Sequence, residues 1–275
     1  MMRRISAILF LLIHILLKNA DAYRNTSLLC LIHTATPSHE TRAHTILRTW
    51  APRCDEFLFF TDSQMSPEIP HVYWPELHTR DHSWEKIRKV FNYVAEKYPR
   101  KFDWYLRADD DAYIVVDNLR AFLSKHSPNV PHYFGYRWNY FSEQGYADGG
   151  AYVLSKPTVE AFNRVMKNNE LCPDFHRAEE DQEISKCLAA VGIYPEDTRD
   201  ENGSERFHHF HPTEQLEMYN DAFARRFAYY TPLKGVKNFS PSMISFHHIS
   251  PYEMRILDYV FYKFKRRKPT SFALK

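Results

Sequence analysis

Three consecutive aspartates, Asp109, Asp110 and Asp111, are the residues of this 275-residue chain that most directly suggest chemistry. They follow an apolar stretch in FDWYLRADDDAYIVVDNL. Adjacent carboxylates repel one another and lose hydration when half buried, so the cluster needs a counter-charge. Carboxylate oxygens suit Mg²⁺ or Mn²⁺, which usually keep open positions for substrate phosphates. A divalent metal is therefore one candidate counter-charge, and an acidic loop neutralised by Arg107 or Lys86 is the alternative.

The elements before the aspartates predict an α/β fold. Residues 28–34 (LLCLIHT) and 56–61 (EFLFFT) are short apolar runs of strand length, and residues 40–50 between them read as a helix. This βαβ pattern predicts a parallel sheet. A further strand over 103–107 would deliver the aspartates to its carboxyl end, which is where open α/β sheets bind ligands.

Helices and strands continue to alternate along the rest of the chain. SWEKIRKVFNYVAEKY has helical periodicity, and we expect Ser83 to cap this helix and Asp117 to cap the next one. PHYFGYRW predicts a strand, and GGAYVLSKPTVEAFNRVM predicts a strand followed by a helix. A last helix is expected over 251–264, with an apolar side made of Ile256, Leu257, Val260, Phe261 and Phe264. No internal repeat or low-complexity linker divides residues 23–275, so we expect one domain.

The first 22 residues have the composition of a targeting segment. Arg3 and Arg4 precede an apolar run over 5–17, and Ala20-Asp21-Ala22 has the form of a cleavage site. The run is short for a bilayer span, which needs about 20 apolar residues. A cleaved signal peptide and an uncleaved signal anchor both remain open, and composition favours cleavage.

Two further features are typical of a protein of the secretory pathway. Three sequons are candidate glycan acceptors, at Asn25, Asn202 and Asn238. The four cysteines form an even set, which in an oxidising compartment allows three disulfide pairings. Proximity in the sequence favours pairing Cys30 with Cys54 and Cys172 with Cys187; the alternative is four buried free thiols.

Composition argues against two classes of protein. A hydrophobic content of 44% supplies a core, which is unlike a disordered chain. The formal net charge is only +2, and the basic residues are scattered except near the carboxyl terminus. A nucleic-acid partner is therefore not expected.

Several pieces of the chain, in order, resemble the inverting β1,3-glycosyltransferases that include Fringe, and most closely their core 1 galactosyltransferase branch. The resemblance covers residues 28 to about 262. The pieces are LLCLIHT, TRAHTILRTWAPRC, WEK with FNYV, DWYLRADDDAYIVVDNLR, YFGYRW, QGYADGGAYVLSK, EEDQEISKC, DTRDENGSERFHHF and SFHHIS. The resemblance implies a GT-A type nucleotide-sugar-binding fold with a mixed, mostly parallel sheet flanked by helices.

The resemblance also implies roles for individual residues. The DDD matches the family's DxD element, which makes Asp109 and Asp111 candidates for holding Mn²⁺ and the nucleotide sugar, with Asp111 the direct ligand. SFHHIS matches a later family element, so His247 is the candidate histidine ligand; without the resemblance it would be read as a packed or loop histidine. EEDQEISKC matches the segment that supplies the catalytic base, which we assign to Asp181, with Glu180 as the fallback. Acidic residues are also favoured at a helix start for electrostatic reasons alone.

Other contacts follow from the same match. We expect the donor nucleotide sugar to be held by Thr34, Arg42, Lys86 and Asp110; Lys86 could instead be a solvated helix residue. Gly149 and Gly150 would let the backbone approach a sugar, unless they only form a turn. Three aromatic rings could stack on the acceptor, although core packing is the stronger default in so aromatic a chain: Trp138, Tyr140 and Tyr146.

The implied activity is transfer of galactose from UDP-galactose to O-linked N-acetylgalactosamine on a glycoprotein. The implied setting is the Golgi membrane, as a single-pass type II protein with a homodimer as its candidate assembly; a soluble lumenal or secreted protein is the alternative. Two features depart from the core 1 pattern: GGAYVLS is one residue shorter than GGAGYVLS, and KNFSPSM stands where a cysteine pair is expected. A sibling transferase with another donor or acceptor therefore stays open. So does a non-catalytic lumenal chaperone, although the intact DDD, Asp181 and His247 favour an enzyme.

Overall fold

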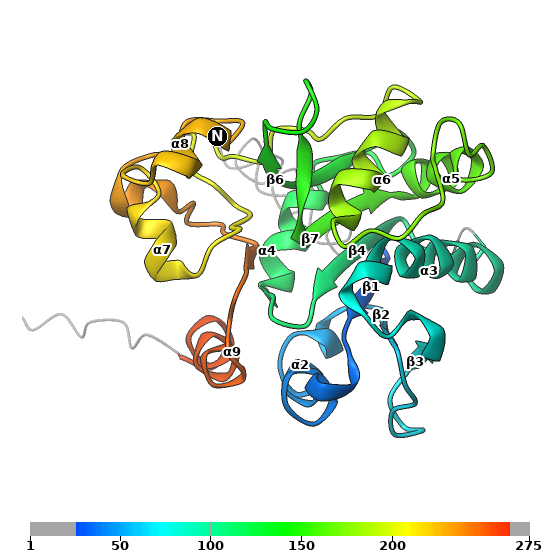
Figure 1. The fold of residues 1–275 in the computed structure, drawn as a ribbon. Coiled ribbons are helices and arrows are strands. Elements are labelled where there is room, and N and C mark those ends of the chain that lie inside the picture. Colours follow the sequence, from blue (N-terminus) through cyan, green and yellow to red (C-terminus); the bar gives the residue numbers. More distant parts are fainter. Residues whose placement is uncertain (1–25, 100, 265–275) are drawn as a thin grey trace, which may run out of the picture.

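The core of the structure is a six-stranded sheet with the strand order β3-β2-β1-β4-β7-β6 (Figure 1). The structure is a computed structural model and describes residues 26–99 and 101–264. The first four strands are parallel, and β7 runs antiparallel to both of its neighbours. A separate antiparallel pair joins β5 to β8. The strands are β1 Leu28–His33, β2 Glu56–Thr61, β3 His71–Tyr73, β4 Trp104–Asp109, β5 Tyr113–Ile114, β6 Tyr133–Trp138, β7 Tyr146–Ser155 and β8 Ser245–Phe246.

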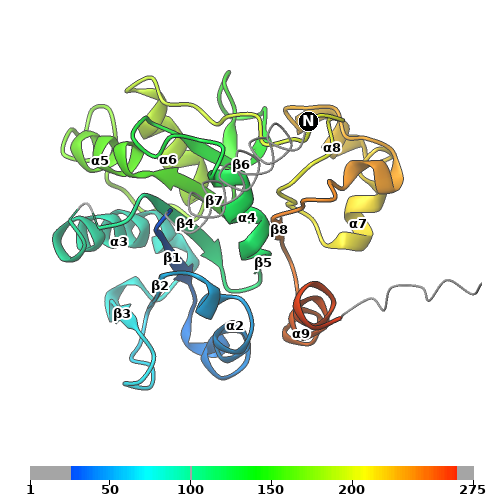
Figure 2. The ribbon, with the colours of Figure 1, turned by 180° about the vertical axis from the view of Figure 1, so that it is seen from behind.

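Helices cover both faces of the sheet because its central strands are apolar on both faces. In β1, Leu29 and Leu31 face one hydrophobic cluster together with α3, α5 and α6, whereas Cys30 and Ile32 face the other together with α2 and α4. Helices α7 and α8 lie together on the side of the molecule opposite α3 and α5, and α9 lies on that same side, in contact with α2 (Figures 1 and 2). The helices are α2 His44–Arg48, α3 Ser83–Lys97, α4 Val116–Leu123, α5 Lys156–Val165, α6 Glu180–Ala189, α7 Pro212–Glu217, α8 Ala222–Phe227 and α9 Pro251–Asp258. The α/β class and the mostly parallel sheet are confirmed.

Both predicted helix caps are wrong. The turn over residues 80–82 leads directly into α3, so Ser83 is already helical and its Oγ donates to the carbonyl of Arg80 instead. Helix α4 begins directly after Val115, whose backbone N–H is held by the carbonyl of Ile244, and Asp117 is therefore the second helical residue.

The last helix buries fewer of its apolar residues than its sequence predicts. It ends at Asp258 and continues as one wider turn to Lys263. Leu257 and Phe261 pack against the core, but Ile256, Val260 and Phe264 are 44%, 52% and 63% exposed. These three are spaced four residues apart and form an exposed apolar stripe along the helix.

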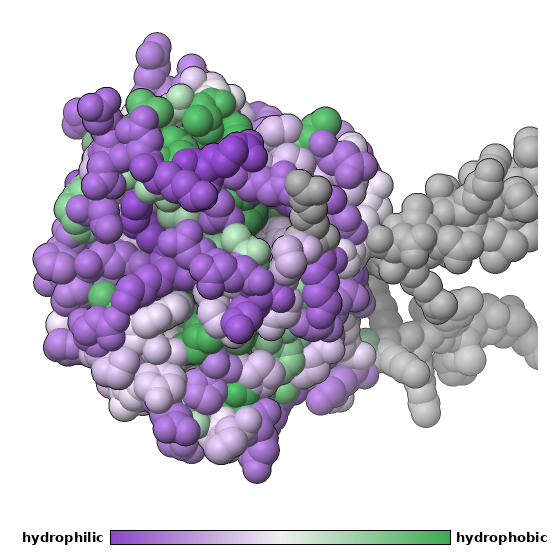
Figure 3. Space-filling view, turned by 90° about the vertical axis from the view of Figure 1, so that its right-hand side faces the viewer, coloured by the Kyte–Doolittle hydropathy of each residue, from purple (hydrophilic) through white to green (hydrophobic). Residues whose placement is uncertain are grey.

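The two disulfides join the pairs that proximity favours. Cys30 in β1 is bonded to Cys54 just before β2, and Cys172 is bonded to Cys187 in α6. The face formed by α3, α5 and β3 is mainly hydrophilic, with apolar side chains in small separate groups (Figure 3). None of the helices in the described residues has the length and apolar character that a bilayer span requires.

The three predicted glycan acceptors have different outcomes. Asn202 is exposed in a turn. Asn238, however, is 1% exposed, and its side-chain amide donates to the Gln215 carbonyl while its oxygen accepts from the Leu233 N–H. A glycan cannot be accommodated on that buried amide, so the prediction for Asn238 is wrong. Asn25 and the predicted targeting segment over 1–22 lie outside the described residues.

Candidate active site

The carboxyl end of β4 opens onto a cavity of about 510 Å³. Its walls include the end of β1, the first half of β7, the start of α6 and the segment that follows β8. Because β7 runs antiparallel to β4 with Ala151 opposite Ala108, the residues just before Ala151 lie beside the aspartates. The sheet topology therefore brings distant polar residues to one edge.

Asp109, the last residue of β4, is neutralised by a cation within the protein. Arg107 Nη2 lies 2.9 Å from Asp109 Oδ1, and His33 Nδ1 lies 3.5 Å from the same oxygen. Burial alone would raise the pKa of Asp109, but the Arg107 guanidinium and the hydrogen bond from His33 hold it well below its usual range. Burial lowers the pKa of His33 to about 4, so its imidazole is neutral at physiological pH.

Asp110 turns away from its neighbours toward the end of β1. Its two carboxylate oxygens accept from Thr34 Oγ1 at 2.7 Å and from Arg42 Nη1 at 3.0 Å. Of these residues, Arg42 remains partly exposed, with 40% of its side chain open to solvent. Thr34, Arg42 and Asp110 all line the cavity, so the structure brings these predicted donor contacts together.

Asp111 and His247 meet because β5 pairs with β8. Tyr113 lies opposite Phe246, and the Ile249 N–H donates to the Asp111 carbonyl at 2.8 Å, so the two chain segments run side by side. His247 Nε2 is 3.1 Å from Asp111 Oδ1 and 3.7 Å from Asp109 Oδ2. One ligand atom from each of Asp109, Asp111 and His247 lies within 4.8 Å of the others, which is a spacing that a single metal ion can span.

Gly150 makes room for His247. A Cβ at position 150 would lie 2.5 Å from Nδ1 and 2.6 Å from Cγ of that imidazole. Asp148, two residues earlier, places Oδ1 3.7 Å from His247 Nδ1 and accepts from Trp138 Nε1 at 2.9 Å. Burial lowers the pKa of His247, but the carboxylates of Asp111, Asp148 and Asp109 raise it to about 9. These three carboxylates favour a positive charge at the position of the imidazole.

Asp181, near the start of α6, faces the cavity from the other side. Its Oδ2 accepts from the Gly149 N–H at 2.9 Å, and its Oδ1 accepts from the Gln182 N–H at 2.9 Å. Burial, reinforced by repulsion from Asp148, raises the pKa of Asp181 to about 7. A carboxylate of that basicity can accept a proton from a hydroxyl group near neutral pH.

Both carboxylate oxygens of Glu180, the fallback base, have partners within the protein. It is 3% exposed, its Oε1 pairs with Arg107 Nη2 at 2.8 Å, and its Oε2 accepts from Tyr152 OH at 3.1 Å. Burial raises the pKa of Glu180 above its usual value in spite of the Arg107 guanidinium. Its oxygens are taken up by Arg107 and Tyr152, so Glu180 is a weaker candidate base than Asp181.

Several other predicted contacts differ in the structure. Lys86 is buried and places Nζ 3.2 Å from His33 Nε2, behind the cavity wall, so it is neither a diphosphate contact nor a solvated residue. Trp138 and Tyr146 are 1% and 2% exposed and pack against other aromatic rings, which leaves no face for stacking on a sugar. Tyr140 is half buried and does line the cavity.

The two glycines lie inside β7, not in a turn before it. A Cβ at Gly149 would meet Asp181 Oδ2 at 3.3 Å, and one at Gly150 would overlap His247. Both glycines therefore make room for side chains of the site itself. Both also line the cavity, and the approach of a sugar to their backbone stays a prediction.

Sequence reasoning missed several residues of the cavity wall, among them His33, Arg80, Asp148 and His209. His33 could have been found, because it ends the strand next to β4 and is paired in register with Asp109. Asp148 directly precedes the glycine pair and lies 2.5 Å from His209 Nδ1. No local pattern marks Arg80 or His209.

Comparison with known proteins places the chain among glycosyltransferases. The Fringe-like family model matches residues 24–218. The glycoprotein-N-acetylgalactosamine 3-beta-galactosyltransferase 1 of Xenopus laevis is 32% identical over 245 residues, which is 87% of this chain and 67% of that protein. The chondroitin sulfate synthase 3 of Mus musculus is 27% identical over 182 residues, or 58% of this chain and 20% of that protein.

Among solved structures, one similar chain is a glycosyltransferase involved in the glycosylation of the major capsid of PBCV-1. It is 15% identical with a TM-score of 0.41, and the match covers 62% of this chain and 81% of that one.

Proposed function

Because the chain belongs to the Fringe-like family of glycosyltransferases, we propose that it transfers galactose from UDP-galactose, in β1,3 linkage, to O-linked N-acetylgalactosamine on glycoproteins. The observation that carries the proposal is the convergence of three features on one cavity: the Asp109–Asp111–His247 cluster, the partly exposed Arg42 and the basic carboxylate of Asp181. The choice of galactose and N-acetylgalactosamine rests on the similarity to the Xenopus laevis enzyme, which covers most of this chain.

The residues present fit a divalent metal. Asp109, Asp111 and His247 offer two carboxylates and one imidazole within 4.8 Å, and Gly150 leaves the space that the imidazole needs. This donor set suits Mn²⁺, and Asp148 is placed to orient the imidazole from behind. Bound there, the metal would offset negative charge on the diphosphate leaving group.

The cavity also holds cations for the donor diphosphate. Arg107 is buried and paired with Asp109 and Glu180, whereas Arg42 is shared with Asp110 and remains partly exposed. Arg80 also lines the cavity. Arg42 and Arg80 are thus the arginines available for phosphate oxygens, and each can present its donors in a fixed fork.

Asp181 supplies the base. In an inverting transfer the acceptor hydroxyl attacks the anomeric carbon as UDP leaves, so the hydroxyl must lose its proton during the attack. Asp181 Oδ2 is held toward Gly149 by a backbone hydrogen bond, which fixes the carboxylate within the cavity. Its pKa of about 7 matches the operating range of a general base.

Two alternatives are weaker on specific observations. A non-catalytic chaperone would not need metal-type ligands and a basic carboxylate together, whereas Asp109, Asp111, His247 and Asp181 all line one cavity. A sibling transferase with another sugar is harder to separate, since chondroitin sulfate synthase 3 also matches this chain.

The proposal includes a location in the lumen of the secretory pathway, as a Golgi membrane protein, and the two disulfides support an oxidising compartment.

A donor and acceptor screen tests the proposal. The purified chain would be given Mn²⁺, one UDP-sugar at a time and a peptide bearing N-acetylgalactosamine, and UDP release and product linkage would be measured. We expect UDP-galactose to support β1,3 transfer to that peptide. Transfer from another UDP-sugar would establish a sibling activity, and no release from any donor would contradict the enzyme proposal.

A further inference from the structure

A second group of metal-ligating side chains lies at the rim of the cavity. His176 Nδ1 is 2.6 Å from Glu85 Oε2, and His82 Nε2 is 3.9 Å from the same oxygen. The three ligand atoms all lie within 4.8 Å of one another. His82 and Glu85 are three residues apart at the start of α3, so they share a face, and His176 comes from the segment between α5 and α6.

We propose that His82, Glu85 and His176 form a metal site that binds Zn²⁺ or a similar borderline cation and ties the start of α3 to the segment before α6. Two imidazoles and one carboxylate are a ligand set that zinc takes, with water in the fourth position. With metal–ligand bonds of about 2.0 to 2.1 Å, tetrahedral ligand atoms lie roughly 3.3 Å apart. The separations of 2.6 and 3.9 Å bracket that value, so small side-chain rotations suffice.

His82 is already oriented for this role. Its Nδ1 lies 2.7 Å from Thr79 Oγ1, and this hydrogen bond leaves Nε2 directed toward Glu85. Histidines that bind metals usually have the second ring nitrogen fixed by such a partner. The hydroxyl of Thr79 therefore selects the ring orientation that a metal would need.

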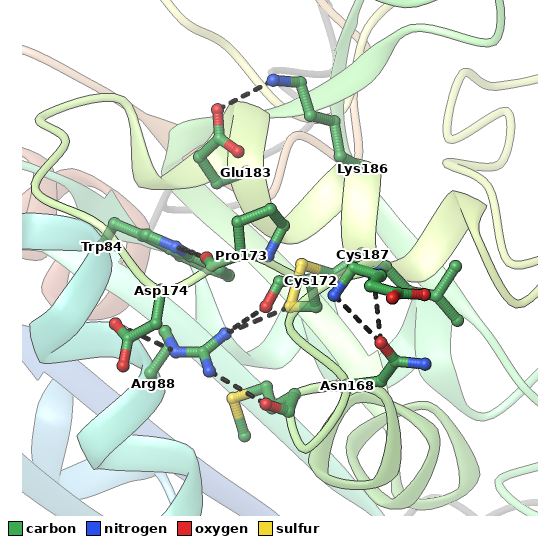
Figure 4. Close-up of a disulfide and its surroundings, with 12 residues drawn as sticks. Trp84, Arg88, Asn168, Cys172, Pro173, Asp174, Glu183, Lys186 and Cys187 are labelled. Atoms are coloured by element: carbon green, nitrogen blue, oxygen red, sulfur yellow. Dashed lines mark hydrogen bonds and ion pairs between the residues drawn. A yellow bond between two sulfur atoms is a disulfide. The ribbon is translucent and has the colours of Figure 1, made fainter.

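The two segments are held together by bonds that do not involve the proposed ligands. The Trp84 N–H donates to the Arg177 carbonyl at 3.0 Å, and Trp84 Nε1 donates to the Pro173 carbonyl at 2.9 Å (Figure 4). Arg88 donates to the carbonyl of Cys172, which is itself bonded to Cys187 in α6 (Figure 4). The ligands are therefore preorganised, and the metal would not have to assemble the site.

The place of this group links it to the cavity. The cavity is lined by Arg80 and Ser83, which are close in sequence to His82 and Glu85. It is also lined by Ala178 and Glu179, which follow His176. A metal at the rim would join these two parts of the wall. The site is distinct in chemistry from the carboxylate-rich cluster, because it offers more imidazole and less negative charge.

Zinc titration of the full-length protein tests the proposal. Both of the other metal-type groups in the described residues contain His247, so the His247→Ala variant removes them together. Calorimetry in that background should show one zinc ion bound per chain. Adding His176→Ala should weaken binding by about 100-fold or more, and adding Thr79→Val should weaken it about 10- to 100-fold, as expected for a partner behind the ligand.

Matched controls separate ligation from other effects. His44 forms a comparable His–Glu pair with Glu40, at 3.8 Å, and adding His44→Ala should leave zinc affinity unchanged. His176 is 69% exposed, so His176→Ala should unfold at the same temperature as its parent in the presence of a chelator. The proposal is overturned if the His247→Ala protein binds no zinc, or if it binds zinc equally well after His176→Ala.

Discussion

Three aspartates in a row are tolerated after β4 because each has its own cationic or hydrogen-bonding partner. Arg107 pairs with Asp109, Arg42 and Thr34 hold Asp110, and His247 faces Asp111. Of the two internal cations named as the alternative counter-charge, Arg107 pairs with Asp109, whereas Lys86 lies against His33. These partners leave Asp111 and His247 as the pair best placed for a metal, since Asp110 turns away from them.

Removing the proposed base should affect turnover and not donor binding. Asp181→Asn keeps the shape of the side chain but cannot accept the proton, so we expect kcat to fall by about 10² to 10⁴ with little change in Mn²⁺ or UDP affinity. The matched control is Glu179→Gln, which alters the neighbouring and more exposed carboxylate. Steady-state kinetics of both variants measure this. Equal losses in the two variants would argue against a specific base.

The pKa of Asp181 predicts the pH dependence of the reaction. A base must be deprotonated, so kcat should fall about tenfold per pH unit below a pKa near 7 and level off above it. The residual activity of Asp181→Asn should lack this acid limb. A wild-type profile that stays flat down to pH 5 would be inconsistent with the assignment.

The same pKa has a consequence for stability. Because the folded-state pKa of Asp181 is raised from 3.8 to about 7, the native state binds the proton more tightly than the unfolded chain does. This group's contribution is therefore fully present below pH 4 and is lost as pH rises to about 7. Asp181→Asn should be more stable than wild type by about 1 to 3 kcal/mol at pH 8 and equally stable near pH 4. Denaturant unfolding of both proteins at the two pH values measures this. Equal stability of the two proteins at pH 8 would contradict the prediction.

At the scale of elements, β7 shapes the site because Gly149 and Gly150 lie in its first half. Gly150→Ala would bring Cβ to 2.5 Å from the His247 ring, and the imidazole would have to move away from Asp111. We therefore expect Mn²⁺ affinity to fall about tenfold or more, comparable with the loss of a supporting partner. Gly149→Ala is the matched control, since its Cβ meets only Asp181 and at 3.3 Å or more. Metal titration that gave the same affinity for both variants would rule out this role.

The disulfide between Cys172 and Cys187 should stabilise the element that carries Asp181. It closes a loop with a sequence separation of 15 residues, for which chain entropy predicts about 3 kcal/mol. Replacing both cysteines by Ala should lower the free energy of unfolding by roughly that amount. Chemical denaturation checks it, with the Cys30–Cys54 double variant for comparison. No loss of stability would mean that Arg88 and Trp84 already hold this segment in place.

Local patterns were enough for most elements and too local for the site. The apolar runs of β1 and β2 and the periodicity of α3 depend on neighbouring residues, so the sequence predicted them. The β5–β8 pair has only two residues in each strand and joins positions more than 130 residues apart, and no local signal marks it. Without that pair, His247 could be assigned only by resemblance.

At the scale of the whole molecule, the sheet edge explains why the predicted residues converge. Strands β1 and β4 end at the cavity, β7 begins there, and α6 starts beside it, so Thr34, Asp109, Gly149 and Asp181 are neighbours. What failed were statements about exposure. Asn238 and Lys86 have surface-type chemistry in the sequence, but tertiary packing buries them. The burial of Trp138 and Tyr146 agrees with the core alternative given for them.

The central claim is that the aspartate cluster with His247 is a site for a metal and a nucleoside diphosphate. It is tested most directly by calorimetric titration of Mn²⁺ and UDP into folded wild type, Asp111→Asn, His247→Ala and Asp181→Asn. We expect Asp111→Asn and His247→Ala to lose affinity for both ligands together, by about tenfold or more, because each removes a ligand from the same ion. Asp181→Asn should bind both ligands as wild type does. If Asp111→Asn also binds Mn²⁺ and UDP with wild-type affinity, the three aspartates are an internally neutralised acidic loop and the claim is wrong.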